Sequence, residues 1–192
     1  MWEDLVLLDQ DIFRFLNSLW IGDFEGFWLF ITEIEHWIPL YLFIFYLIFK
    51  NYRRPINFMG IASVFVVAVS TLSLTNLVKN YVARLRPNNE PLLMDSIRIL
   101  QTPENFSFWS GHSAVSFAVA TFAVILLSQK INTKWIYLIY VWPILFALSR
   151  IFVGVHYPVD IIVGMIVGLL LGLAFAKAFT LTVDRFNYKQ PL

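Results

Sequence analysis

Three short clusters of basic and polar residues interrupt an otherwise apolar chain. They are Lys79 with Arg86-Pro87, then Ser110-Gly111-His112, then Ser149-Arg150 with His156 and Asp160. Guanidinium groups bind phosphate oxygens through paired hydrogen bonds, and an ammonium group adds a point charge. Histidine can attack an electrophile or carry a proton. The residue types therefore predict a site that binds a phosphate and transfers a phosphoryl group.

Five of these residues are predicted to bind the phosphate. Arg86 and Arg150 can each present a planar fork to phosphate oxygens, and Lys79 adds a third positive charge. Ser110 and Gly111 are expected to open a helix. Unpaired backbone N–H groups and the positive end of the helix dipole favour an anion there.

Two histidines and an aspartate supply the candidate reactive groups. His156 and Asp160 are four residues apart, so they share a face if this segment is helical. Asp160 can hold one imidazole N–H, fix the tautomer and stabilise the charged ring that forms on attack. His156 then presents its other nitrogen as a nucleophile, and His112 can donate a proton to the leaving oxygen.

The order, spacing and residue types of the three clusters resemble the signature of the type 2 phosphatidic acid phosphatase (PAP2) superfamily. The signature here reads Lys79-x6-Arg86-Pro87, Ser110-Gly111-His112 and Ser149-Arg150-x5-His156-x3-Asp160. It covers residues 79–160 of the 192. The chain departs from the family at Trp109, where Pro usually precedes Ser-Gly-His. This difference bears on the direction in which the following helix begins and removes no reactive group.

The resemblance implies hydrolysis of a lipid phosphate or diphosphate ester without a metal ion or other cofactor. It implies that His156 forms a phosphohistidine oriented by Asp160, and that His112 protonates the leaving group and then helps to activate water. The phosphoryl oxygens would be bound by Lys79, Arg86, Ser110, Gly111 and Arg150. Small bacterial members act on undecaprenyl diphosphate, phosphatidylglycerol phosphate, phosphatidic acid or lipid A 1-phosphate. The compact chain favours undecaprenyl diphosphate.

The composition places these residues in a membrane protein. Hydrophobic residues make up 59% of the 192 residues and charged residues 14%, against roughly 45–50% and about 25% in an average globular chain. The mean hydropathy is +0.70. A soluble domain of this size has too little polar surface to cover so many apolar side chains. The net charge of +1 gives no global attraction to nucleic acid, so none is expected as a partner.

The apolar segments predict one all-α domain over residues 1–192, a helix bundle with five transmembrane helices. A spanning helix needs about 20 apolar residues to cross roughly 30 Å of hydrocarbon. Five segments meet or approach this length: 34–50, Asn57–Val78, Ser113–Ser128, Trp135–Ser149 and Tyr157–Ala176. Six spans is the alternative, if part of residues 5–35 inserts more deeply.

An amphipathic helix is predicted before the first span. Its apolar residues recur at helical spacing: Leu5, Leu8, Ile12, Phe15, Leu16 and Leu19. Asp4, Asp11 and Asn17 lie on other faces. Such a helix is expected to lie in the membrane interface rather than to cross the bilayer. Glu33 and Glu35, with His36, are expected at the wet end of the first span, with a metal or acid–base set as the alternative.

The basic residues of the loops predict the orientation. Three groups fall on one side of a five-span bundle: Lys50, Arg53 and Arg54; Lys130 and Lys134; and Lys177, Arg185 and Lys189. The positive-inside rule makes that side cytoplasmic. The loop 79–109 is then expected at the extracytoplasmic face, and the resemblance to small bacterial members implies that the membrane is a bacterial inner (plasma) membrane. Its cations break the rule, and an anionic ligand would explain them.

Two arginines of this loop are given other roles. Arg84 is expected to be a rim or lipid-headgroup contact, because the family spacing selects Arg86 as the phosphate ligand. Arg98 is expected to be a solvated loop charge.

Two other functions would use the same residues. A zinc site at His112, His156 and Asp160 is disfavoured, because the neighbouring cations would repel a metal ion. An anion transporter or lipid-binding protein would explain the cations. It would leave the His156–Asp160 pair beside a second histidine without a role. The sequence therefore predicts an integral-membrane lipid phosphatase, with a lipid phosphate and membrane lipids as its partners.

Overall fold

The computed structural model describes residues 2–19 and 24–189, and this described part is built of helices without strands. The α-helices are α1 (Trp2–Ser18), α2 (Glu25–Thr32), α3 (Ile38–Asn51), α4 (Ile56–Val82), α5 (Gly111–Ser128), α6 (Val141–Phe152) and α7 (Pro158–Lys189). The 3₁₀ helices are η2 (Ile34–Trp37), η3 (Pro87–Asn89) and η4 (Lys134–Tyr140). The prediction of an all-α fold is confirmed.

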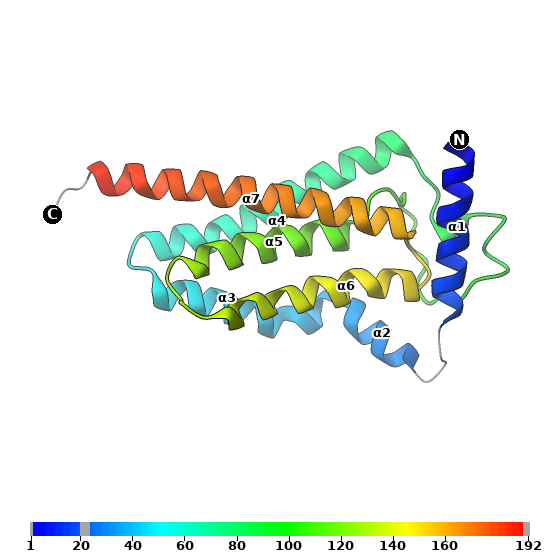
Figure 1. Cartoon of the computed structure of the whole chain (residues 1–192), viewed down its shortest axis with the longest axis horizontal. Coiled ribbons are helices and arrows are strands. Elements are labelled where there is room, and N and C mark those ends of the chain that lie inside the picture. Colours follow the sequence, from blue (N-terminus) through cyan, green and yellow to red (C-terminus); the bar gives the residue numbers. More distant parts are fainter. Residues whose placement is uncertain (1, 20–23, 190–192) are drawn as a thin grey trace.

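The helices α3 to α7 run along one common direction, and α1 runs across one end of the bundle (Figure 1). The central helix is α5, which packs against α3, α4, α6 and α7. It can occupy this position because most of its side chains are buried and many are small, such as Ala114, Ala118 and Ala120. Small residues let helix backbones approach closely within a membrane.

Within residues 2–19 and 24–189, four helical segments are long and apolar enough to cross a membrane. They are Ile56–Asn89, Gly111–Ser128, Lys134–Phe152 and Pro158–Arg185. A fifth span exists if Glu25–Thr32 and Ile34–Asn51, which meet at a bend of 72°, count as one. The bend falls in the region where the acidic residues Glu33 and Glu35 were expected to end the first span.

The helices α4 and α7 differ from their predicted limits. The helix α4 continues to Val82, so Lys79 lies in its last turn rather than in a loop. The helix α7 begins at Pro158 rather than at Tyr157 and continues well beyond Ala176. Proline is well suited to the first position of a helix, where its missing N–H has no intrahelical acceptor. His156 therefore precedes the helix, and only Asp160 belongs to its first turn.

The apolar stripe of α1 faces away from the bundle. Five of its six predicted members are 42–61% exposed: Leu5, Leu8, Ile12, Phe15 and Leu19. The sixth, Leu16, is half-buried and packs against the core cluster that contains Phe13. The opposite face is buried although three of its four residues are polar: Asp9, Gln10, Phe13 and Asn17. An interfacial helix needs an outward apolar face to contact lipid. The arrangement agrees with the predicted interfacial position.

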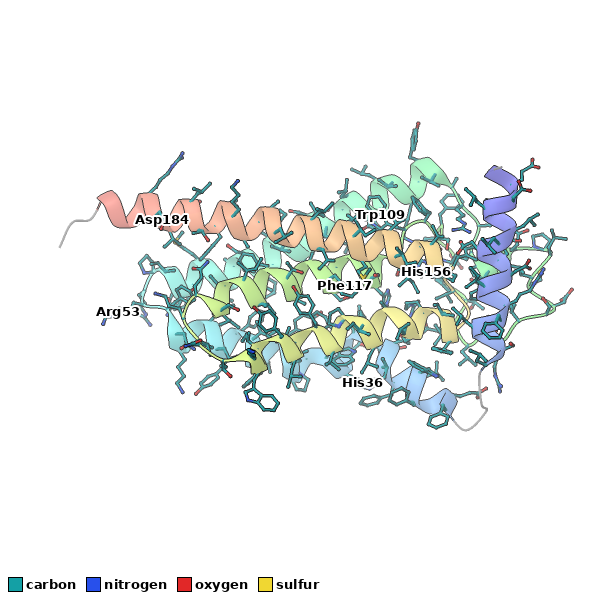
Figure 2. The ribbon with its side chains drawn as sticks, viewed as in Figure 1. His36, Arg53, Trp109, Phe117, His156 and Asp184 are labelled. Atoms are coloured by element: carbon teal, nitrogen blue, oxygen red, sulfur yellow. The ribbon has the colours of Figure 1, made fainter. Side chains whose placement is uncertain are left out.

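The basic loops and His156 lie at opposite ends of the bundle. Arg53, in the turn between α3 and α4, and Asp184, near the end of α7, lie at one end (Figure 2). The turn from α5 to η4, which carries Lys130, lies at the same end (Figure 1). His156 lies at the other end, beside α1 (Figure 2). The predicted sorting of the loop charges is therefore realised in the fold.

Three glycines spaced four residues apart bring α7 against α5. A Cβ atom at Gly164 would lie 2.7 Å from the Ser110 carbonyl oxygen, and one at Gly172 would lie 2.6 Å from Cβ of Thr121. A Cβ atom at Gly168 would meet Cβ of Phe117 at 2.9 Å and would also press on the Ala114 carbonyl. Since backbone atoms cannot move aside as a flexible side chain can, this stripe must remain free of side chains.

We expect Gly168→Leu to destabilise the bundle by separating α7 from α5. Overpacking of this kind costs about 1–3 kcal/mol, which corresponds to a melting temperature lower by several degrees in a domain of this size. Thermal unfolding of the detergent-purified protein measures the effect. The matched control is Gly26→Leu, because a Cβ atom at Gly26 meets nothing within 4 Å. Equal melting temperatures for the two variants would contradict the packing argument.

Candidate active site

The predicted site residues gather at the end of the bundle that α1 crosses. Lys79 comes from the last turn of α4, Arg150 from α6, and Asp160 from the first turn of α7. Most of the predicted set is buried, with at most 4% exposure: Lys79, Arg86, Ser110, Arg150, His156 and Asp160. Gly111 and His112 are half-buried. The fold thus brings together all eight residues that the sequence analysis selected.

The Asp160 carboxylate holds the His156 ring at its Nδ1 atom. Its Oδ2 atom lies 3.2 Å from Nδ1 of His156 and accepts a hydrogen bond from the Tyr157 backbone N–H at 3.1 Å. The latter bond is the second half of a capping box, in which an acidic side chain in the first turn reaches back to the N-cap N–H. The Ser107 hydroxyl also donates to Oδ2. Asp160 is thereby fixed by its own helix as well as by its partners.

The opposite nitrogen of His156 faces the guanidinium group of Arg86. The distance from Nε2 of His156 to Nη1 of Arg86 is 3.0 Å. Arginine has donors only, so Nε2 must be the acceptor and Nδ1 must carry the proton. This tautomer directs the Nδ1 proton to Asp160 and leaves the Nε2 lone pair on the side of the cations.

The environment of His156 strongly favours the neutral ring. Burial lowers the pKa of His156 well below its usual value near 6.5, because a charged imidazolium would lose its hydration. Nearby positive charges lower this pKa further: Arg86, Lys79, Arg150 and Arg84. An unprotonated Nε2 is what a nucleophile or a general base requires.

Two of the predicted phosphate-binding cations are held by neutral acceptors. Lys79 Nζ donates to the carbonyl oxygens of Phe106 at 2.5 Å and Ser107 at 2.9 Å. Arg86 donates to the Asn105 carbonyl through Nε and to the Asn105 side chain through Nη2, both at 2.7 Å. It also donates to the Val155 carbonyl at 2.9 Å. Since these acceptors carry no full charge, the positive charge of the two side chains is not cancelled.

Arg150 is held on the other side of the site, by α2 and by the loop 83–110 between α4 and α5. Its Nη1 donates to the Thr32 hydroxyl and to Oε1 of Gln101, the latter at 2.8 Å. Nε2 of Gln101 in turn donates to Glu33 at 3.0 Å. The Nε group of Arg150 is buried and has no acceptor among the described residues. A buried donor without a partner is costly, and an oxygen of a bound anion could satisfy it.

The beginning of α5 differs in one respect from the prediction. Ser110 is the N-cap, and its side chain accepts from the Ser113 N–H at 3.3 Å. Its own backbone N–H donates to the Asp160 carbonyl at 3.0 Å. The prediction that this N–H would bind an anion is therefore wrong. Gly111 and His112 follow as the first two helical residues, whose N–H groups have no intrahelical acceptor. The N–H donors for an anion are therefore theirs.

His112 lies within the electrostatic range of the other site residues. It interacts electrostatically with four of them: Arg150, His156, Arg86 and Lys79. The His112 ring packs against Phe146 with 4.7 Å between ring centroids. The residue before Ser110 also has a defined contact, since the Trp109 indole N–H donates to the Thr75 hydroxyl on α4 at 2.9 Å. This bond anchors the beginning of α5 at the position where the chain departs from the family pattern.

The prediction for Arg84 is wrong. Arg84 is neither a rim residue nor a headgroup contact, because it forms ion pairs with Asp160 at 2.8 Å and Asp9 at 2.7 Å. Its guanidinium group also lies 3.9 Å from the Tyr157 ring centroid. Asp9 was not predicted as a site residue, although Asp9, Phe13 and Asn17 follow one another at four-residue intervals and so share a helix face. Arg98, expected to be solvated, is partly exposed and forms an ion pair with Glu25.

The acidic segment before α3 forms no metal-binding group. Nδ1 of His36 lies 2.7 Å from the Phe30 carbonyl, and its ring stacks on the Phe30 ring. Glu33 binds Gln101. Within residues 2–19 and 24–189 no three His, Cys, Asp or Glu side chains are arranged to hold a metal ion. The alternative of a metal or acid–base set there is not supported.

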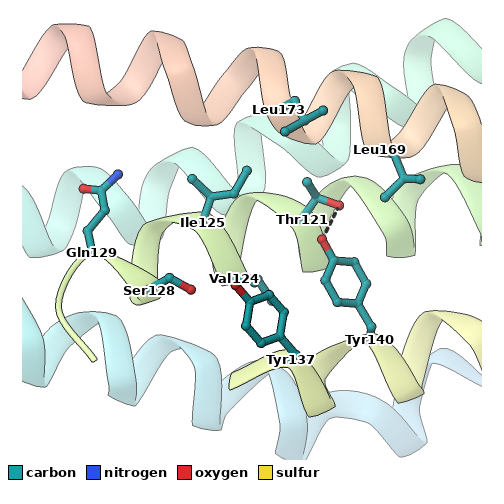
Figure 3. A pocket seen from close by; sticks show the side chains of 9 residues that line it. All are labelled: Thr121, Val124, Ile125, Ser128, Gln129, Tyr137, Tyr140, Leu169 and Leu173. Atoms are coloured by element: carbon teal, nitrogen blue, oxygen red, sulfur yellow. Dashed lines mark hydrogen bonds between the residues drawn. The ribbon is translucent and has the colours of Figure 1, made fainter. Parts of the chain in front are cut away.

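A groove elsewhere on the bundle contains none of these residues. It lies between α5, η4 and α7 (Figure 3). It is lined by Thr121, Val124, Ile125, Ser128, Gln129, Tyr137, Tyr140, Leu169 and Leu173. The Tyr140 hydroxyl donates to the Thr121 hydroxyl at 3.0 Å inside it. The groove is apolar and uncharged, so it is not a second phosphate site.

The chain resembles known phosphatases in sequence. A Bacteroides thetaiotaomicron lipid A 4'-phosphatase is 27% identical over 85% of this chain and 73% of its own length. An undecaprenyl-diphosphatase of Sulfolobus acidocaldarius is 31% identical over 84% of this chain and 74% of its own length. A Porphyromonas gingivalis lipid A 4'-phosphatase is 26% identical over 84% of this chain and 69% of its own length.

The fold also matches solved structures. The PAP2-type phosphatidylglycerolphosphate phosphatase of Bacillus subtilis superposes with a TM-score of 0.76, over 95% of this chain and 89% of that chain at 22% identity. LpxE of Aquifex aeolicus superposes with a TM-score of 0.63, over 87% and 93% of the two chains at 21% identity. The PAP2 superfamily model matches residues 59–183, which is most of the chain and includes every predicted site residue. The chain therefore belongs to the PAP2 superfamily and is a phosphoric ester hydrolase of the lipid-phosphatase type.

Proposed function

We propose that this protein hydrolyses a lipid phosphate or diphosphate ester through a phosphohistidine at His156, without a metal ion. The observation that carries the proposal is the orientation of the His156 ring. Its Nδ1 is held by Asp160 at 3.2 Å, and its Nε2 lies 3.0 Å from Arg86. A phosphoryl group bound to Arg86 would therefore be adjacent to the lone pair of Nε2.

Binding of the phosphoryl group uses the charge that is not cancelled at the site. Arg86, Arg150 and Lys79 bind its oxygens, and the unpartnered Nε of Arg150 gains an acceptor. The N–H groups of Gly111 and His112 add donors at the positive end of the α5 dipole. Ser110 acts mainly by capping α5. Preorganised cations stabilise the charge that develops in phosphoryl transfer, and this is the main catalytic term in such reactions.

The first chemical step transfers the phosphoryl group to the enzyme. Nε2 of His156 forms a bond to phosphorus, and the bond between phosphorus and the leaving oxygen breaks. The negative charge of the bound phosphate offsets the cations around His112 and favours its protonated form. His112 then donates a proton to that oxygen, so the lipid alcohol or lipid phosphate leaves in protonated form. The imidazole ring becomes positively charged, and Asp160 stabilises it through Nδ1–H.

The second step releases inorganic phosphate. His112, which has lost its proton, removes a proton from a water molecule. The water oxygen forms a bond to phosphorus, and the bond between phosphorus and Nε2 breaks. His156 returns to its neutral form and His112 to its protonated form, so the cycle closes without a redox cofactor or an added base.

The preferred substrate in this proposal is undecaprenyl diphosphate. One relative, 31% identical, is an undecaprenyl-diphosphatase, while two others are lipid A 4'-phosphatases. Phosphatidylglycerol phosphate, phosphatidic acid and the lipid A phosphates are the alternatives. The site would lie at the extracytoplasmic face of a bacterial inner membrane, because the basic loops lie at the opposite end of the bundle (Figure 2).

We expect His156→Ala to abolish phosphate release, with a loss of at least about 10³-fold that reflects removal of the nucleophile. Phosphate release from the detergent-purified protein in EDTA measures it. The matched control is His36→Ala, because His36 is exposed and its ring contacts Phe30 rather than a site residue. Turnover by the His156→Ala protein would overturn the proposed nucleophile, and loss of wild-type activity in EDTA would overturn the metal-free reaction.

We expect the acidic limb of the kcat/KM profile to lie well below pH 6.5. The pKa of His156 is lowered by burial and by neighbouring cations, so the nucleophile stays unprotonated as the pH falls through 6.5. Activity is lost only when the pH falls through the lowered pKa. Phosphorus NMR of the free substrate separates its own ionisation from that of the enzyme. An acidic limb at or above pH 6.5 that does not follow the substrate would contradict the assignment.

We expect undecaprenyl diphosphate to give the highest kcat/KM in a panel of mixed micelles. The panel contains phosphatidylglycerol phosphate, phosphatidic acid and lipid A with single phosphates at the 1 or 4' position. His156→Ala serves as the background for each lipid. A higher value for any other lipid would overturn the substrate preference and leave the reaction class unchanged.

A further inference from the structure

Arg84 joins two carboxylates that come from opposite ends of the chain. Its Nη1 lies 2.8 Å from Oδ1 of Asp160 and its Nη2 lies 2.7 Å from Oδ2 of Asp9. Its guanidinium group also covers the Tyr157 ring. Asp9 is 4% exposed and Asp160 is fully buried. The guanidinium group is thus held in one plane and one direction by three neighbours.

The two oxygens of Asp160 have separate partners. Oδ1 accepts from Arg84, while Oδ2 accepts from the Tyr157 N–H and the Ser107 hydroxyl and faces Nδ1 of His156. Arg84 therefore balances the charge of the carboxylate without occupying the oxygen that holds the histidine. It also fixes the rotation of the carboxylate, since both oxygens are engaged.

Asp9 ties this arrangement to α1. Its Oδ1 accepts from the Val159 backbone N–H at 3.0 Å, and its Oδ2 is the one bound to Arg84. Burial raises the pKa of Asp9, and the bond from Arg84 opposes this rise. The Phe13 ring packs against Tyr157 with 5.6 Å between centroids. The buried face of α1 thus contacts the first turn of α7 directly beside Asp160.

We propose that Arg84 is a positioning residue for the Asp160–His156 pair, and that Asp9 of α1 acts by holding Arg84. This inference rests on the proposed function, since it gives Asp160 the task of orienting the nucleophile. Arg84 does not touch the substrate in this proposal. Its effect reaches the reaction through the Asp160 carboxylate that it orients and through the positive charge that it places near His156.

A second consequence concerns the phosphate-binding cations. Asp160 attracts Lys79 and Arg86 electrostatically. Without Arg84, the Asp160 carboxylate could move toward these two cations. Such a movement would neutralise the charge that binds the substrate. Arg84 therefore keeps Asp160 on the histidine and away from the phosphate site.

The charged groups around the pair come from every element that packs against it. Around His156 they are Lys79 of α4, Arg84 and Arg86 of the following loop, His112 of α5, Arg150 of α6 and Asp160 of α7. Around Arg84 they are Asp9, Asp160 and Tyr157. Loss of Arg84 removes a positive charge that disfavours the imidazolium. The pKa of His156 should then rise.

The test compares Arg84→Gln, Arg84→Lys, Asp9→Asn and the Arg84→Gln/Asp9→Asn double variant. We expect Arg84→Gln to lower kcat about 10- to 100-fold, by analogy with the loss of an outer hydrogen-bond partner of a metal-binding histidine. The acidic limb of its kcat/KM profile should move to higher pH. Arg84→Lys keeps the charge but not the fork, so its acidic limb should stay near that of the wild type while kcat falls.

The double variant shows whether Asp9 acts through Arg84. Asp9→Asn alone should lower kcat several-fold. The double variant should be no slower than Arg84→Gln, because Asp9 has no arginine to hold once Arg84 is replaced. The control is Asp11→Asn, which breaks the exposed Asp11–Arg14 pair on the same helix and should behave as the wild type. Thermal unfolding of each variant accounts for changes in folded fraction.

Two results would overturn the inference. One is an Arg84→Gln protein with the kcat and pH profile of the wild type. The other is full additivity of the Asp9 and Arg84 effects, which would make Asp9 an independent packing residue. Neither result bears on the nucleophile, because trapping of labelled phosphate on wild-type protein but not on His156→Ala tests the proposed function separately.

Discussion

The buried carboxylate of Asp160 is the constraint on which the site end of this protein depends. A carboxylate without water is stable only if its charge is balanced and its lone pairs are satisfied. Here a serine, a backbone N–H, a histidine and an arginine do this together. Its backbone carbonyl also binds the Ser110 N–H, which joins the first turns of α5 and α7. Asp160 thus links α7 to the loop 83–110 and to the beginning of α5, and through Arg84 it is linked to Asp9 of α1.

The charge of Asp160 is balanced by its neighbours, whereas the positive charges nearby are held by uncharged acceptors and are not balanced. Lys79 and Arg86 are bound by carbonyl and amide oxygens of residues 105–107 and 155, and Arg150 by a hydroxyl and an amide. These acceptors orient the cations but leave their charge in place. A carboxylate in the same positions would bind more strongly and would remove the attraction for an anion. Arg84, which lies beside Asp160, differs from these three cations because it is paired with the acids Asp9 and Asp160.

The helix α1 has an outward apolar face and an inward polar face, the reverse of a surface helix in a soluble protein. In a soluble protein its leucine stripe would face the core and its acidic residues the solvent. Here the stripe faces outward and Asp9, Gln10 and Asn17 face inward. Asn17 supports this packing by bonding the carbonyls of Arg98 and Ile151. One helix can therefore contact lipid on one side and support the charged site on the other.

The residues that gather at the candidate site, their order and the helical membrane bundle could be predicted from the sequence. Helical periodicity and the length of apolar runs are local properties, and the spacing from Lys79 to Asp160 is visible along one dimension. The roles of Arg84, Asp9, Ser107 and Asn105 were decided only by the tertiary structure. Arg84 binds partners 75 and 76 residues away, and Asp9 bonds Val159 across 150 residues. Such pairings depend on how helices pack around a buried charge, which no local pattern in the chain encodes.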